Sequence, residues 1–204
     1  GGLLHQVTRI ADMMHLEGKD RERVGAMVIG RFRDGTPLAL SARTNRNLGD
    51  ADDFTYAGDP NGAKCPFHAH IRKVNPRSNE QFADPAVNRI VRRAIPYGVH
   101  HGVPASSLPP EKLPSTGVGL LFMCFQRLVE AQFNLIQAAW ANSPQAGSTR
   151  SGRDALIGQT HGTAVAQQWP YEYREKEPCH AATFGDFVKM KGGEFFFAPS
   201  MPFL

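Results

Sequence analysis

The sequence lacks the features that mark several large classes of protein. No apolar run reaches the roughly 18 residues that a membrane-spanning helix needs. No long block of like charge occurs, although the formal net charge is +4. There is also no internal repeat and no coiled-coil pattern. With 204 residues, of which 41% are hydrophobic and 21% charged, the chain has the composition of one large or two small globular domains, and we expect no membrane partner.

Cysteine is scarce, and its spacing excludes a disulfide framework. Cys65, Cys124 and Cys179 are odd in number and far apart, which favours a reducing compartment. The chain starts with neither Met nor a basic stretch followed by an apolar core, so no secretory signal is visible. We therefore expect a cytoplasmic location. The missing Met indicates a fragment, a processed product or a truncation.

Apolar spacing predicts a mixture of helices and strands. Helices are expected over residues 3–16 and 126–142, a short apolar element over 24–30, and strands over 67–74, 117–125 and 187–197. The strand at 67–74 is expected because Pro66 and Pro76 bracket it, and the strand at 117–125 is expected to be buried. The last segment has the pattern of two strands joined at a Gly-Gly turn. Because these elements do not alternate strictly, we expect an α+β fold with an antiparallel sheet.

The stretch from Lys64 to Arg77 concentrates a thiol, two imidazoles and four cations. One interpretation is a zinc site with Cys65, His68 and His70 as ligands. A fourth ligand is then needed from His100 or His101, and no Cys-x-x-Cys motif supports such a site.

A second interpretation is nucleic-acid binding, and a third is a plain strand with solvated basic side chains. Six cations fall within 22 residues: Arg72, Lys73, Arg77, Arg89, Arg92 and Arg93. The aromatic residues of a base-stacking platform are sparse here, so we expect no nucleic-acid partner. A solvated face is the usual explanation of such a run.

A fourth interpretation is a haem site, in which one imidazole ligates the iron and nearby arginines pair with the propionates. The order Cys65-Pro66, Ala69-His70-Ile71-Arg72 and Asn75-Pro76-Arg77 closely resembles the haem-binding segment of the dye-decolourising peroxidase family. Three further blocks resemble that family in order and spacing: Arg92–Gly98, Gly119–Gln126 and Gly192–Ser200. The resemblance runs from about residue 24 to residue 204 and covers only the C-terminal half of the family's members.

The resemblance implies a ferredoxin-like α+β unit, with an antiparallel sheet and flanking helices, that binds haem b (iron protoporphyrin IX). Residues 1–204 would then form the haem-binding C-terminal domain, with the N-terminal half absent from this chain. His70 falls where the family places the proximal iron ligand. His68 is its competitor, because two positions along a strand share one face.

The resemblance also assigns roles to six further residues. Arg92 falls on the distal catalytic arginine, and Leu120 and Phe122 fall where the family covers the distal side of the haem. Asn75 and Arg77 resemble positions near a propionate, although a turn role before Pro76 explains Asn75 equally well. Asp154 is a candidate to accept the second N–H of the iron-ligating imidazole, with a helix or turn cap as its alternative role.

The implied function is a haem-dependent peroxidase that uses hydrogen peroxide to oxidise dyes, phenols and similar small aromatic reductants through a ferryl haem. Four aromatic residues are candidates for an electron relay or for packing: Trp140, Trp169, Tyr171 and Tyr173. The family's Gly-x-x-Asp-Gly motif, which carries a distal acid, is not found in this chain. We therefore expect a companion chain with the N-terminal half, or a homo-oligomer, and keep as an alternative a haem-handling protein with little peroxidase activity.

Overall fold

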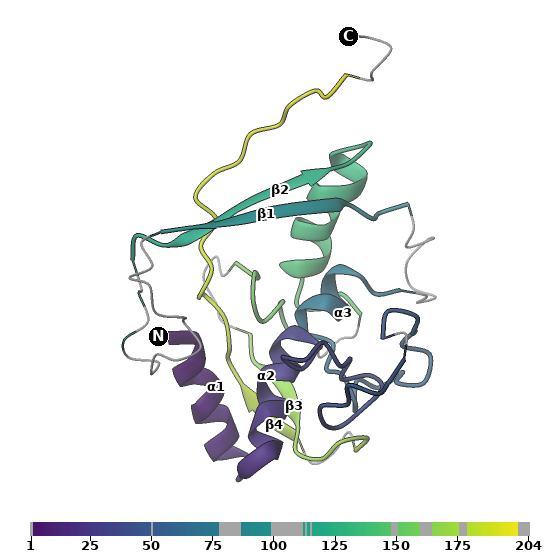
Figure 1. Ribbon diagram of the computed structural model, residues 1–204, viewed down its shortest axis with the longest axis vertical. Coiled ribbons are helices and arrows are strands. Elements are labelled where there is room, and N and C mark those ends of the chain that lie inside the picture. The colour runs from purple at the N-terminus through teal and green to yellow at the C-terminus, as the bar shows by residue number, and fades with distance from the viewer. Residues whose placement is uncertain are drawn as a thin grey trace.

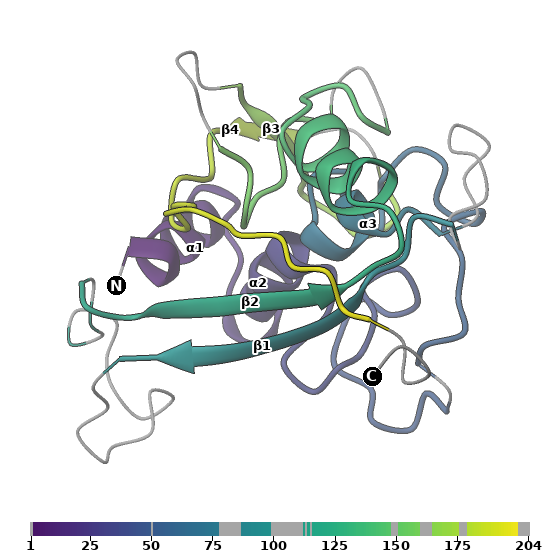
Figure 2. The same cartoon turned by 90° about the horizontal axis from the view of Figure 1, so that it is seen from above.

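In the computed structural model, helices pack beside two antiparallel strand pairs (Figures 1 and 2). The structure describes residues 2–49, 51–77, 87–98, 112, 114, 116–147, 151–159, 165–175 and 179–199. This combination of helices and antiparallel pairs confirms the predicted α+β class. None of the helices in the described ranges combines the length and the hydropathy that crossing a bilayer requires.

The N-terminal helices form one side of the core. Helix α1 (Gly2–Met13) is followed by the 3₁₀ turn η1 (Gly18–Asp20) and by helix α2 (Arg21–Ile29). The helix predicted at the start of the chain is confirmed. Its apolar stripe places Ile10 and Ala11 in the core, where both are essentially fully buried. Helices α1 and α2 pack against each other.

Helix α2 ends where the sequence predicts, at Gly30. This residue has a φ of 99°, and its backbone N–H donates to the carbonyl of Ala26, the usual geometry of a glycine that ends a helix. A Cβ at Gly30 would also collide with the side chain of Ile71, which belongs to helix α3 (His70–Val74). Gly30 therefore both ends α2 and lets α3 approach it closely.

The strands form two separate antiparallel pairs. Strand β1 (Val91–Tyr97) pairs with β2 (Gly119–Phe125), and β3 (Gln167–Pro170) pairs with β4 (Cys179–Ala182). The strand predicted at 117–125 is confirmed, but its predicted burial is wrong. The side chains of Leu120, Leu121 and Phe125 are 56 to 61% exposed, because the described part of the chain leaves both faces of this pair largely uncovered.

The helix predicted at 126–142 is observed as η4 (Glu130–Ala141), wound as a π-helix. The backbone N–H of Asn142 donates to Gln137 O at 3.1 Å, an i to i+5 bond, whereas sequence periodicity had indicated ordinary α spacing. Helix η4 packs directly on α3, as both ribbon views show (Figures 1 and 2). It therefore covers the segment that carries the two histidines.

The strand pair predicted for the C-terminal end is wrong. Residues 187–199 run as an irregular extended segment that leads away from the packed helices, without turning back at Gly192-Gly193 (Figure 1). A strand needs a neighbouring backbone to pair with. Within the described part of the chain, residues 187–199 have no such partner.

Candidate functional site

The site is built on helix α3, a segment for which the sequence predicts a strand. Ala69 is still extended, with ψ of 130°, and the helix runs from His70 until Asn75 leaves helical geometry before Pro76. The prediction of an extended segment over 67–74 is therefore wrong. Both prolines lie outside the helix, where they cost it no hydrogen bond, and packing against η4 and α2 stabilises a turn too short to form alone.

This change of geometry separates the two histidines, which would share a face on a strand. His68 precedes the helix and is 1% exposed, with its ring centroid 4.3 Å from that of Trp169. Burial, and secondarily the charge of Lys73, lowers the pKa of His68 to about 3, so its ring stays neutral. His68 is a core residue, whereas the side chain of His70 remains 16% exposed.

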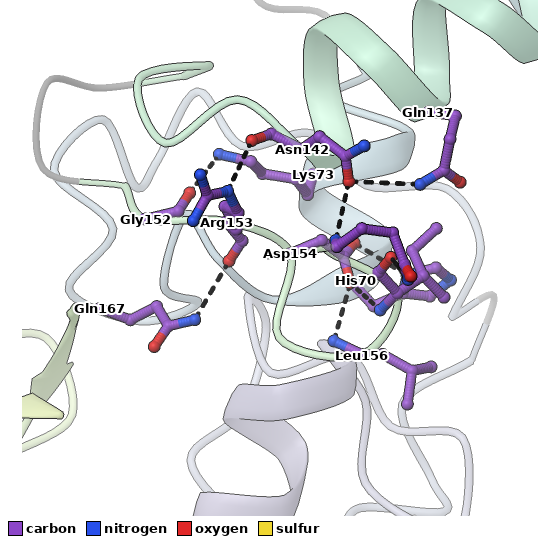
Figure 3. A network of polar contacts seen from close by, with 11 residues as sticks. His70, Lys73, Gln137, Asn142, Gly152, Arg153, Asp154, Leu156 and Gln167 are labelled. Atoms are coloured by element: carbon purple, nitrogen blue, oxygen red, sulfur yellow. Dashed lines mark hydrogen bonds and ion pairs between the residues drawn. The ribbon is translucent and has the colours of Figure 1, made fainter. Parts of the chain in front are cut away.

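The His70 ring is held by Asp154. Its Nδ1 lies 2.9 Å from Asp154 Oδ2, in a contact between α3 and the loop after η4 (Figure 3). The other carboxylate oxygen, Oδ1, accepts the backbone N–H groups of Leu156 and Ile157, each at 2.8 Å. A carboxylate can only accept, so the Nδ1 of the ring carries the proton and Nε2 keeps a free lone pair.

The backbone around Asp154 is fixed as firmly as its side chain. The N–H of Asp154 donates to Ala141 O at 2.9 Å, and the N–H of Ala155 donates to His68 O at 3.1 Å. Asp154 is therefore bonded to the end of η4 on one side and to the residues before α3 on the other. Its carboxylate is 1% exposed and has little freedom to leave the His70 ring.

The zinc interpretation does not fit these residues. Cys65 is fully buried, and burial raises the pKa of its thiol to about 12, so the side chain is a neutral core group. The described residues contain no group of three or more His, Cys, Asp or Glu side chains placed to hold an ion. His100 and His101 lie outside the described residues.

The basic run divides into a buried and an exposed part. Arg72 is 5% exposed and forms a buried ion pair with Asp59, with Nη1 2.6 Å from Oδ2, while its guanidinium lies over the rings of Tyr56 and Phe67. Lys73 is equally buried. Arg72 and Lys73 are consequently unavailable to a nucleic acid, and for these two the interpretation as a solvated strand is wrong because a helix turns them inward, whereas Arg89, Arg92 and Arg93 are exposed.

Asn75 and Arg77 lie just beyond α3. The N–H of Asn75 donates to Ile71 O and closes the helix. Arg77 donates from Nη1 to the carbonyls of Asp52 and Phe54, at 2.7 and 2.8 Å, and its guanidinium lies 3.9 Å from the centre of the Phe54 ring. Its other two guanidinium nitrogens have no hydrogen-bond partner within the described residues.

The strand register places Arg92 with two other predicted site residues. Arg92 lies opposite Cys124, and Phe122 and Leu120 follow at alternate positions along β2. Opposite residues and alternate residues share a face, so Arg92, Phe122 and Leu120 lie on one face of the pair, with Arg93 on the other. The Phe122 ring is 6.2 Å from that of Phe133 in η4, which links this face to the helix above α3.

The structure therefore assembles the predicted residues in two groups. His70 and Asp154 are in contact, and Arg92, Leu120 and Phe122 share a strand face; in the described part of the chain, no hydrogen bond joins the groups. The structure adds Lys73, which the sequence did not single out as a site residue. Its amine donates to the loop that leads to Asp154. The only sequence signal is that it follows His70 by three residues, about one helical turn.

Comparisons with known proteins identify the family of the chain. The family model described as "Dyp-type peroxidase, C-terminal" matches residues 6–163. The multifunctional dye peroxidase DyP2 of an Amycolatopsis species is 41% identical over 203 residues, covering 96% of this chain and 43% of the relative. A dye-decolorizing peroxidase of Exidia glandulosa is 32% identical, covering 86% of this chain and 36% of the relative.

Solved structures show the same likeness. The structure of DyP2 from Amycolatopsis superposes with a TM-score of 0.77 at 39% identity, over 89% of this chain and 40% of that one. This likeness confirms the predicted ferredoxin-like α+β fold. The chain spans about two-fifths of the length of these relatives. It belongs to the dye-decolourising peroxidase family, of which it matches the C-terminal part.

Proposed function

We propose that residues 1–204 form the haem-binding C-terminal domain of a peroxidase that uses hydrogen peroxide to oxidise dyes, phenols and similar small aromatic molecules. The observation that carries this proposal is the His70–Asp154 pair. Nδ1 is engaged by the carboxylate, Nε2 has no hydrogen-bond partner within the described residues, and the ring is partly exposed. This arrangement is how proteins prepare an imidazole to ligate a metal.

The donor set fits haem b better than a bare metal ion. One imidazole nitrogen has no hydrogen-bond partner among the described residues, and these contain no group of three or more His, Cys, Asp or Glu side chains to hold a bare ion, which suits an axial ligand of a porphyrin. The two guanidinium nitrogens of Arg77 that have no hydrogen-bond partner among the described residues suit an anionic propionate, and Asn75 precedes Arg77 by two residues. Leu120 and Phe122 offer an apolar face to the distal side of the ring. When bound, haem supplies the redox chemistry of peroxide cleavage.

Arg92 is the residue of this chain that we assign to the reaction itself. As the O–O bond of hydrogen peroxide breaks, negative charge grows on the departing oxygen. A guanidinium held on a strand stabilises that charge without having to reorganise, as the donors of an oxyanion hole do. Leu120 and Phe122 are 58 and 41% exposed in this chain, so they would exclude water and strengthen the interaction only once another surface covers this face. We expect Arg92→Ala to lower the turnover rate by roughly 10²–10³-fold while the haem stays bound.

We propose that the distal acid comes from the part of the relatives that this chain does not match, carried by a companion chain. The large exposed apolar side chains of β1 and β2 support such a partner, because surfaces of this kind are normally covered in the working assembly. Native mass spectrometry of the purified protein tests this. It should show a companion polypeptide together with haem, whereas a homo-oligomer of this chain alone would contradict the proposal.

The decisive experiment replaces the imidazole of residue 70. We expect the full-length protein to show a Soret band and to oxidise a phenol or an anthraquinone dye only with peroxide, and His70→Ala to lose both. His5→Ala is the matched control, because His5 is exposed on α1 and should change neither. An unchanged absorption spectrum in His70→Ala would refute the assigned iron ligand. A Soret band without any turnover in the wild type would instead favour haem handling.

A further inference from the structure

Lys73 is a buried cation next to the pair that carries the proposed function. It lies on α3 three residues after His70, and the residue is 4% exposed. Its Nζ donates to Ala146 O at 2.9 Å, to Ser151 Oγ at 2.8 Å and to Gly152 O at 2.7 Å, so all three ammonium hydrogens are used. Figure 3 shows Lys73 beside Gly152. The amine thus binds α3 to the loop that ends in Asp154.

The partners of Lys73 are neutral oxygens, although a carboxylate lies close by. In the described part of the chain, no Asp or Glu oxygen comes within ion-pair distance of Nζ. Two titratable side chains, those of Asp154 and His68, nevertheless interact electrostatically with Lys73. Burial lowers the pKa of Lys73 to about 7 while the charge of Asp154 raises it, and Lys73 in turn lowers the pKa of His68. Lys73 therefore stands between the core histidine and Asp154.

A buried ammonium has lost its hydration, which is unfavourable unless hydrogen bonds and an opposite charge compensate for the loss. Asp154 is a buried carboxylate whose only close ion-pair partner among the described residues is the imidazole of His70. The positive charge of Lys73, whose amine donates to the carbonyl of Gly152 two residues before Asp154, balances part of that negative charge.

We propose that Lys73 is a positioning residue for the iron-ligating pair, holding the 151–154 loop against α3 and limiting, by its positive charge, the pull of Asp154 on the Nδ1 proton of His70. The inference rests on the proposed function, since it matters only if His70 ligates haem iron. It adds to that function a control over how strongly the ligand donates. The loop contacts act on geometry, and the charge acts on the shared proton.

The direction of the effect follows from two contributions that agree in sign. Without the cation, Asp154 attracts the Nδ1 proton more strongly, which makes His70 a more electron-rich ligand and favours the ferric state. Loss of a nearby positive charge also favours the more positively charged oxidation state. Both lower the reduction potential of the iron.

The experiment compares four variants of the full-length protein at pH 6, where the Lys73 amine is mostly protonated. Lys73→Met and Lys73→Gln remove the charge, and the amide of Gln retains hydrogen-bond donors. Lys73→Arg keeps the charge, and Ser151→Ala removes one hydrogen-bond partner without changing any charge. Midpoint potential is measured by spectroelectrochemistry. The chemical shift of the His70 Nδ1 proton is measured by NMR in the haem-free protein.

We expect both neutral variants to shift the midpoint potential downward and the Nδ1 proton downfield. Lys73→Arg should stay near the wild-type potential, and Ser151→Ala should lower only the melting temperature. Haem-bound neutral variants with unchanged potential, or an equal shift in Ser151→Ala, would overturn the inference. So would unfolding of both neutral variants, which would make the role purely structural. A wild type that binds no haem would refute the proposed function instead.

Discussion

Two regions of this molecule treat their apolar residues in opposite ways. The packed region comprises α1, α2, α3, the loop 151–159 and the β3–β4 pair; the open region comprises the β1–β2 pair and segment 187–199. Trp169 and Phe184 in the packed region are 0 and 3% exposed, and their rings lie 5.5 Å apart. In the open region, Phe196 and Phe197 are 87 and 83% exposed.

This difference shows which part of the chain buries its apolar side chains by itself. The packed region closes around His68 and Asp154 with contacts from within the chain, so the His70–Asp154 pair, for which we propose iron ligation, is organised by this chain's own residues. The open region presents aromatic and aliphatic side chains that only another surface can bury. The proposed distal face, with Arg92, Leu120 and Phe122, belongs to the open region. The proximal half of the site is thus self-sufficient, and we expect the distal half to require the companion.

The strongest way to break the packed region is to remove Asp59. Its Oδ2 accepts from Arg72 and from the N–H of Cys65, and Oδ1 accepts from the N–H of Lys64. Asp59→Ala leaves a guanidinium buried without its partner, so we expect a loss of about 3–5 kcal/mol in the free energy of unfolding, measured by urea titration.

The control for this prediction is an exposed ion pair. Asp12 is bonded to Arg21 at 2.7 Å, but the two side chains are 61 and 37% exposed. Asp12→Ala should therefore cost less than about 1 kcal/mol. Equal costs in the two variants would mean that the buried pair around Arg72 does not hold the packed region together.

The comparison can be sharpened with one substitution made in both regions. Phe184→Ala should cost about 3–5 kcal/mol of unfolding free energy, because it opens a cavity beside Trp169. Phe196→Ala should change the value by less than about 0.5 kcal/mol in this chain alone. If the open region is an interface, the cost of Phe196→Ala should rise once the companion is bound. A large cost for Phe196→Ala in the chain alone would contradict the division into two regions.

A further test of the packed region concerns acid stability through His68. Its pKa is lowered to about 3 in the folded chain, below the ordinary value of 6.5, so between these values only the unfolded chain takes up the proton. Stability is then fully present above about pH 6.5 and falls as the pH drops, by roughly 1.4 kcal/mol per pH unit. In His68→Phe this slope should be missing from the unfolding free energy measured between pH 6.5 and 4. His5→Phe, at an exposed position, should keep it.

Local pattern was enough for those elements whose stability is mainly local or whose apolar stripe is long. The first helix of the chain and the strand at 117–125 follow from periodicity and from residue type, whereas residues 24–30 were predicted only as a short apolar element and form part of α2. Helix α3 does not, because a five-residue helix is stabilised by its neighbours and not by its own sequence. The prediction of two strands at the C-terminal end is wrong for a related reason. Strand pairing depends on a partner backbone, and residues 187–199 have none within the described part of the chain.

The same division holds for the site. Residue identity and order determined by themselves that His70, Asp154 and Arg92 were candidates, since the ordered blocks around them carry the family resemblance. The resemblance already favoured His70 over His68, but only the tertiary structure gave the two rings different surroundings, because a helix start places one in the core and the other against a carboxylate. It also decided that Lys73 is an interior charge, since burial and hydrogen-bond partners come from segments distant in sequence, here 73 to 79 residues away.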